Sequence, residues 1–252
     1  SNFSNNLSVS RRLKTKGAYV SLRLRQDHSN SDNNSLFNSN REIFGDNPNV
    51  EIQNQNIQSN SHRDEYGVTG SYRNLLLSNL FYSFSYEYSN ESEKSERRVL
   101  DFDENTGEYS NINENLSNAF SIRSNKHIPK AGIRFDDDTL TISLNAGLNR
   151  TELRTNNLIQ DINFENDFNI FAYNGYIAYR FKNKARLSSW FRNSTQIPGV
   201  SQLQPVTIQT NPLNITTGNP DLEASFLHNF SLSYRKYDYK TRSGFGIYSN
   251  FT

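Results

Sequence analysis

The sequence predicts an all-β fold of antiparallel strands. Apolar and polar residues alternate with a period of two in one segment after another, which is typical of strands with one apolar and one polar face. Short polar turns join these segments in pairs, as in β-hairpins. Helical periodicity is not sustained anywhere along the chain. A further observation is that short turns alternate with long polar stretches.

The clearest strand lies at residues 139–149. Its even positions carry Leu, Ile, Leu, Ala and Leu, whereas its odd positions carry Thr, Ser, Asn and Gly, so one face is wholly apolar and the other polar. The same alternation marks five further segments, at 18–25, 80–88, 171–181, 186–192 and 229–235, and weaker ones near 3–13, 63–73, 117–135 and 244–252. Together they predict about ten strands.

The composition indicates strands that each have only one apolar face. Tyr (14) and Phe (17) are abundant, which argues against disorder, yet only 34% of residues are hydrophobic and the mean hydropathy is −0.80. A barrel with lipid outside and water inside explains both values. No run of about 18 apolar residues is present, but a strand crosses a membrane in about 9–11 residues. We therefore predict an antiparallel transmembrane β-barrel.

The connections alternate in length, as in outer-membrane barrels. Short turns are expected at 14–17, 76–79, 136–138, 182–184 and 238–244, and long polar loops at about 27–62, 89–117, 150–167 and 193–224. In such barrels the short turns are periplasmic and the long loops extracellular. We therefore expect the chain in the outer membrane of a Gram-negative cell, in that orientation.

Arginines occur on the polar parity of the predicted strands. An arginine facing lipid at the bilayer midplane costs roughly 2–4 kcal/mol, and this pattern avoids that cost, although any antiparallel sheet with one buried face would do the same. Trp190 shares the inward parity of Arg186 and Arg192. The candidates to face the lumen are Arg23, Arg25, Arg134, Arg180, Arg186, Trp190, Arg192 and Arg235.

No pattern of a metal site is recognised. Cysteine is absent, and His28, His62, His127 and His228 are scattered without ligand spacing, so we interpret them as loop and rim residues. The run that begins at Asp101 resembles a calcium loop, but Thr106 replaces the turn glycine and Ile112 the bidentate glutamate. We expect a solvated loop tip there.

Catalysis is not expected either. Asp136, Asp137 and Asp138 could form a paired-carboxylate site, but they lie between two alternating segments and are better explained as a hairpin turn. No nucleophile elbow, phosphate loop or dinucleotide fingerprint occurs. We assign no catalytic residue, cofactor or metal and expect no enzyme. The net charge of +1, without a long run of one sign, excludes a typical nucleic-acid surface.

Tyrosines at strand ends have two interpretations. Tyr86, Tyr88 and Tyr179 could stack against a ligand, but aromatic girdles at the two membrane interfaces are the commoner use of such residues. We favour girdles.

One passage resembles a known family. Pro198–Pro205, Asn211–Ile215 and the run Gly218–Leu222 (Gly-Asn-Pro-Asp-Leu) are similar to the loop-to-strand passage of TonB-dependent receptor barrels, in their outer membrane protein beta-barrel branch. In that family the run commonly continues Lys-Pro-Glu, whereas Glu223–Ser225 stand here before the expected strand. The resemblance implies a barrel of about 22 strands with a periplasmic plug and a TonB-contacting segment. Residues 1–252 would then be one incomplete barrel domain without the plug.

Three functions remain open from the sequence. The resemblance implies uptake of a nutrient or metal chelate across the outer membrane. The partners would be outer-membrane lipid, the plug domain, the TonB system and an unknown small-molecule or oligomeric substrate. The alternatives are a small passive porin and a soluble secreted β-sandwich that binds glycans. The first and last segments alternate weakly, so we expect an open, curved sheet with two unpaired edges rather than a closed barrel.

Overall fold

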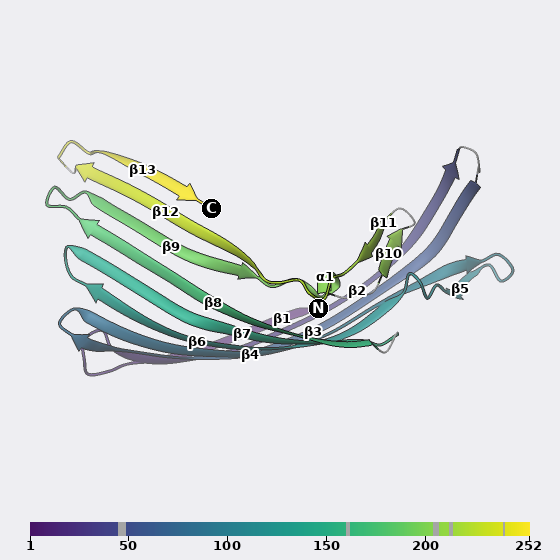
Figure 1. Cartoon of the computed structure of the whole chain (residues 1–252), viewed down its shortest axis with the longest axis horizontal. Coiled ribbons are helices and arrows are strands. Elements are labelled where there is room, and N and C mark those ends of the chain that lie inside the picture. Colours follow the sequence, from purple (N-terminus) through teal and green to yellow (C-terminus); the bar gives the residue numbers. More distant parts are fainter. Residues whose placement is uncertain (45–48, 160–161, 204–206, 212–213, 239) are drawn as a thin grey trace.

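A computed structural model describes residues 1–44, 49–159, 162–203, 207–211, 214–238 and 240–252. Ten strands follow one another in one antiparallel sheet, in the order β1-β2-β3-β4-β6-β7-β8-β9-β12-β13, while β5 pairs with β4 and β10 pairs with β11 (Figure 1). The helix α1 (Val200–Leu203) is a single turn. No helix among the described residues is long and apolar enough to cross a membrane. The strands are β1 (Asn2–Arg12), β2 (Tyr19–Ile43), β3 (Asn49–Leu77), β4 (Leu80–Asp103), β5 (Glu108–Ile112), β6 (Asn118–Asp136), β7 (Leu140–Asn157), β8 (Ile162–Arg180), β9 (Arg186–Gln196), β10 (Thr207–Asn211), β11 (Asn214–Thr217), β12 (Ser225–Asp238) and β13 (Ser243–Phe251).

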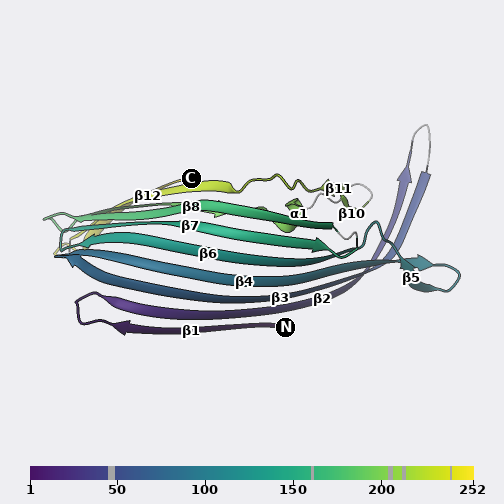
Figure 2. The same ribbon diagram turned by 60° about the horizontal axis from the view of Figure 1, so that its bottom comes forward.

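The sheet is an open trough. Figures 1 and 2 show the long strands side by side, curving from β1 at one edge to β13 at the other. These two edge strands do not pair with each other within the described residues. The structure therefore confirms the all-β antiparallel fold, the number of about ten strands and the expectation of two unpaired edges.

The two faces of the sheet differ as the alternation predicts. Residues of the apolar parity stay accessible; the exposed fractions of the Phe84, Leu144 and Ile177 side chains are 56%, 40% and 43%. On the opposite surface, called here the polar face, Thr151 and Ser231 are buried. Soluble monomers rarely expose a continuous apolar surface of this extent, because its hydration is unfavourable. The apolar band therefore fits contact with lipid, and its side chains do not meet in a dry core.

The apolar band has the height of a membrane core. In β7 it runs from Leu140 to Leu148, nine residues, which matches the length needed for a strand to cross. Aromatic side chains lie at both ends of the band. The end near the short turns carries Tyr179, Phe181, Tyr234 and Phe245 in a chain of ring contacts. The other end, called here the outer girdle, carries Tyr66, Tyr86, Tyr88, His127, Tyr173 and His228.

Three of the four long loops expected from the sequence, at 27–62, 89–117 and 150–167, are mostly strand where described, so the expectation was wrong there; residues 193–224 do connect β9 to β12. β2 and β3 continue as a paired hairpin to Ile43 and Asn49, so residues 27–62 are not a loop where described. β4 extends to Asp103, about 80 Å in all at ~3.3 Å per residue, of which Leu80–Tyr88 spans the band. Beyond the apolar band neither face needs an apolar contact, so the apolar–polar alternation disappears while backbone pairing continues. Figure 2 shows the β2–β3 and β4–β5 hairpins projecting past the ends of β6, β7 and β8.

The short turns lie where they were predicted, and all five join consecutive strands of the sheet. Gly17, Asn79 and Lys184 adopt positive φ values of 77°, 64° and 64°, as tight turns require. The carboxylate of Asp137 accepts hydrogen bonds from the backbone N–H groups of Thr139 (2.7 Å) and Leu140 (2.6 Å), so the three aspartates form a hairpin turn. The calcium-like run is the β4–β5 hairpin, with the Asn105 N–H bonded to Asp103 at 2.9 Å.

One irregularity interrupts the centre of the sheet. Pro129 pairs with Tyr86 of β4, but the pairing of β6 with β7 breaks at residues 128–129. Proline has no N–H to donate to the ladder. A Cβ atom at Gly147 of β7 would lie 2.5 Å from the Pro129 carbonyl oxygen. Glycine at position 147 thus permits the close approach of the two strands.

Candidate functional site on the polar face

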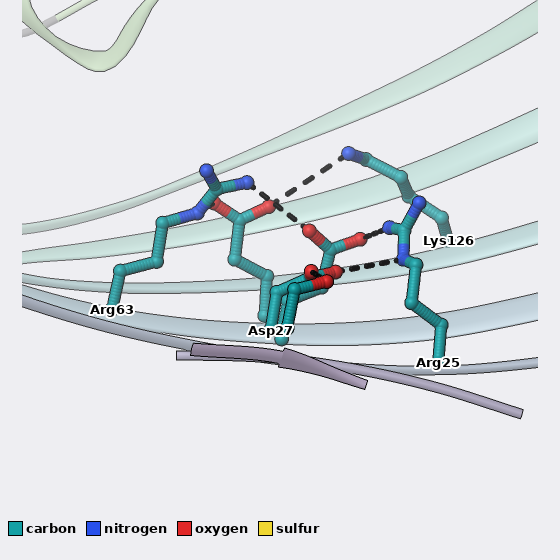
Figure 3. Close-up of polar contacts among 7 residues, drawn as sticks. Arg25, Asp27, Arg63 and Lys126 are labelled. Atoms are coloured by element: carbon teal, nitrogen blue, oxygen red, sulfur yellow. Dashed lines mark hydrogen bonds and ion pairs between the residues drawn. The ribbon is translucent and has the colours of Figure 1, made fainter. Parts of the chain in front are cut away.

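Six charged residues form a continuous set of ion pairs across four strands of the polar face, called here the ion-pair ladder (Figure 3). Arg25 of β2 bonds to Asp27 at 3.0 Å and also to Glu65 of β3. Arg63 contacts Glu65 at 3.2 Å and Glu91 of β4 at 2.6 Å. Lys126 of β6 lies 3.8 Å from Glu91 and ends the ladder.

The ladder is balanced in charge and partly shielded from water. It holds three basic and three acidic side chains, and the Glu65 and Glu91 side chains are only 10% and 18% exposed. Each of these two carboxylates contacts cations from two different strands, so the ladder ties β2, β3, β4 and β6 together. We therefore interpret it as a structural element of the wall.

A second group, called here the aromatic platform, lies on β8 and β9. The guanidinium of Arg192 lies over the Trp190 ring, 5.2 Å from its centroid. Trp190 is directly opposite Tyr176, whose hydroxyl accepts a hydrogen bond from Arg186 at 2.7 Å. Trp190 remains 36% exposed. The platform thus offers an indole face and guanidinium groups to the space inside the trough.

A row of arginines lies beside the platform at the end with the short turns. Arg180, Arg186 and Arg235 occupy directly opposite positions on β8, β9 and β12. Like charges opposite one another in a sheet are destabilising. Among the described residues no acidic side chain pairs with these three, whereas Arg134 contacts Asp136 at 3.0 Å. The row is therefore a positive surface that suits an anionic partner.

All eight candidates proposed from the sequence lie on the polar face. Arg25 belongs to the ladder, Trp190, Arg192 and Arg186 to the platform, and Arg180 and Arg235 to the row. Arg23 lies between Ser8 and Thr69 in the register. The parity of the alternation thus placed these residues on one face, but their grouping depends on the register between strands.

The passage that carried the family resemblance docks on the polar face. Asn166 of β8 donates to the Pro220 carbonyl at 3.0 Å, and the Asn219 N–H donates to the Gln202 carbonyl at 2.6 Å. Leu203 is fully buried in a cluster with Leu153, Phe168 and Ile170. The connection between β9 and β12 is thereby folded over the inner surface. Of the resemblance residues, Gln204, Pro205, Pro212 and Leu213 lie outside the described residues.

The histidines are strand residues rather than loop residues. His127 and His228 belong to the outer girdle, where their Nδ1 atoms lie 2.6 Å from the Tyr86 hydroxyl and 3.1 Å from the Tyr173 hydroxyl. His28 and His62 lie together with Asp64 on the outer surface. The sequence alone indicates part of this cluster, since His62 and Asp64 are two residues apart and share one face of β3. The proximity of His28 to them depends on the register between β2 and β3.

The comparisons with known proteins agree with this geometry. The model of the outer membrane protein beta-barrel family matches residues 11–252. The chain belongs to this family. Membership confirms the resemblance found in residues 198–238 and places this family member in the outer membrane. No curated protein has a matching sequence.

The solved structures that this family member resembles include the ferric citrate transporter FecA in its unliganded form. The TM-score is 0.60 at 11% sequence identity, and the match covers 93% of this chain and 32% of the FecA chain. At this identity the likeness shows the fold alone. The family member spans about a third of the length of that transporter.

Proposed function

We propose that this protein is the barrel wall of a TonB-dependent transporter that takes up a nutrient or a metal chelate across the outer membrane. Family membership and the likeness to a transporter barrel support this function. So does the two-faced sheet, whose apolar band suits lipid and whose polar face suits a hydrated interior.

The observation that carries the proposal is the shape of the sheet. Ten strands curve without bringing β1 and β13 together, and the trough matches part of the longer FecA chain. A small passive porin made of these strands alone would need continuous pairing between these two edges. A wide barrel instead leaves room for a plug domain, and further strands would then be needed to close the barrel between β13 and β1.

We infer the orientation from the hairpins, which extend far beyond one end of the apolar band and end in short turns close to the other. The short turns would face the periplasm, and the extended hairpins, above all β2–β3, would face the exterior. In this orientation the arginine row lies near the periplasmic mouth and the ion-pair ladder near the outer interface. A plug and the TonB system would approach from the side of the row.

The aromatic platform and the arginine row are the surfaces that we assign to cargo or plug. An exposed indole and guanidinium groups that lack an acidic partner among the described residues bind planar and anionic groups well, whereas each charged group of the ladder has an ion-pair partner. The carboxylates of a metal chelate or of a plug surface have the required sign. Substitution on the platform should therefore alter uptake without altering assembly.

Conductance and uptake together test the proposal. The full-length protein, inserted into a planar lipid bilayer, should show no steady open-channel current, because a plugged barrel is closed at rest. Steady conductance would instead favour the passive porin. In cells that depend on this protein for growth on a candidate chelate, loss of TonB should abolish uptake, and uptake that persists without TonB would refute the transporter.

Variants on the two faces sharpen this test. We expect Trp190→Ala and Arg192→Ala to reduce uptake while the protein still reaches the membrane in normal amounts. Ser189→Ala, on the opposite face of the same strand, is the matched control. Equal uptake by all three variants would exclude the platform from cargo or plug binding.

A further inference from the structure

Three potential metal ligands converge on the outer surface of β2 and β3. His28 and Asp64 are directly opposite each other in the register, and His62 lies two residues before Asp64 on the same face. The His28 Nδ1 atom lies 2.8 Å from one Asp64 carboxylate oxygen, and the His62 Nε2 atom lies 2.9 Å from the other. The two imidazole rings are edge to face, with centroids 5.0 Å apart.

This arrangement has the chemistry of a site for a transition metal. The three ligand atoms lie within 4.8 Å of one another, so small side-chain rotations would place all of them on one ion at the usual zinc distances of about 2.0–2.2 Å. Two imidazoles and a carboxylate suit zinc, and three protein ligands leave a coordination position for water. The cross-strand pair holds two of the ligands on rigid, hydrogen-bonded backbone.

The Asp64 carboxylate supplies the negative charge of the cluster. The hydrogen bond from His28, with a second from His62, holds the pKa of the Asp64 carboxyl below its ordinary value, so this group is an anion at neutral pH. Ser92 and Lys94 of β4 lie opposite Asp64 and His62 on the same face. The Lys94 side chain is exposed and is the nearest competing cation in the register.

The cluster lies where the strands leave the membrane. Tyr66 of the outer girdle is two residues after Asp64 on the same face of β3. The ligands are therefore just beyond the apolar band, on the opposite side of the sheet from the ladder and the platform. Water reaches them, since the His28, His62 and Asp64 side chains are 31%, 47% and 31% exposed.

We propose that His28, His62 and Asp64 form a binding site for a divalent transition-metal ion of the zinc class. The ion would replace the two hydrogen bonds between the histidines and the carboxylate, with each ring proton held on the nitrogen that does not bind the metal, and would clamp β2 to β3 where their long hairpin begins. The site does not involve the polar face, so it is independent of the transport function proposed above. Its metal would be part of the wall and not cargo.

Zinc titration of the full-length protein in detergent tests the site. After removal of metals with a chelator, Zn²⁺ is titrated against a competing chromogenic chelator. We expect the His28→Ala, His62→Ala and Asp64→Ala variants each to weaken this binding by about 100-fold or more, since loss of even an outer-shell group costs 10–100-fold. Binding should also weaken in acid, because the ligands must be deprotonated.

Matched controls come from the girdle histidines. His127→Ala and His228→Ala remove imidazoles that have no carboxylate partner in the described part of the chain, and zinc affinity should stay within about twofold of the parent protein. The heat-dependent shift of folded barrels on gels verifies that every variant is folded. Zinc X-ray absorption of the loaded protein should show two imidazole nitrogens in the first shell. Failure of the parent protein to bind zinc, or equal binding by the His28→Ala, His62→Ala and His127→Ala variants, would overturn the proposal.

Discussion

Placing an arginine at Leu144 tests the assignment of the two faces most directly. Leu144 is the midpoint of the Leu140–Leu148 band, is 40% exposed on the apolar surface and lies between Ile133 and Gly175 in the register. Arginine on a lipid face near the midplane costs roughly 2–4 kcal/mol. Because about 1.4 kcal/mol corresponds to a tenfold change, the folding equilibrium of Leu144→Arg should fall roughly 30- to 700-fold.

The next residue along the chain is the control. Asn145 lies on the polar face between Gly132 and Asn174, so Asn145→Arg would place the same guanidinium in water. Its effect should stay within about 0.5 kcal/mol, as for most surface substitutions. Urea unfolding of both full-length variants in lipid vesicles, read by the gel shift of the folded barrel, gives the two free energies. Equal destabilisation by the two substitutions would refute the assignment of the faces.

Three further predictions concern particular contacts. Gly147→Ala should destabilise the sheet by about 1–3 kcal/mol in urea unfolding, because the added Cβ atom would lie 2.5 Å from the Pro129 carbonyl oxygen. Gly70→Ala is the control and should be neutral, since no atom lies within 4 Å of a Cβ placed there. Equal effects of the two substitutions would argue against the close approach of β6 and β7. Glu65→Gln should lower the free energy of unfolding by about 1–2 kcal/mol, since it removes the carboxylate that Arg25 and Arg63 share. Glu96→Gln, which breaks an exposed ion pair with Arg98, should lower it by less than about 0.5 kcal/mol in the same assay. The lowered pKa of Asp64 means that its carboxylate stabilises the fold above its ordinary value of 3.8 and that this contribution is lost as pH falls through the lower folded value. The difference in free energy of unfolding between the parent protein and Asp64→Asn should therefore vanish in strong acid. A difference that does not change with pH would contradict this role of the Asp64 carboxylate.

The membrane-spanning part of the fold was predictable because alternation is a local signal. Each strand between the two aromatic girdles has one face toward lipid and one toward water, so apolar and polar residues alternate along it. The hairpin turns were predictable for a similar reason, since Gly17 and the Asp136–Asp138 run provide turn chemistry within a few residues. The eight lumen candidates followed from parity alone.

The parts of the strands that extend beyond the apolar band were not predictable in this way. Residues 27–62 are rich in Ser and Asn on both parities, so nothing in the sequence separates a solvated hairpin from a loop. Their strand structure comes from backbone pairing that propagates along β2 and β3 from the membrane. Strand propensity and apolar–polar alternation do not predict a strand whose two faces both contact water.

The sequence by itself determined the class of fold, the two faces of each strand, the positions of the short turns and, through a short passage before β12, the family. These properties depend on residues close together in the chain. Only the tertiary structure decided which side chains meet, because register joins residues that are far apart in sequence. It brought His28 to Asp64, linked Arg25 to Lys126 through the ladder and aligned Arg180, Arg186 and Arg235 in one row. It also left β1 and β13 apart, since the curvature of the whole sheet, and not any single strand, decides whether the edges meet.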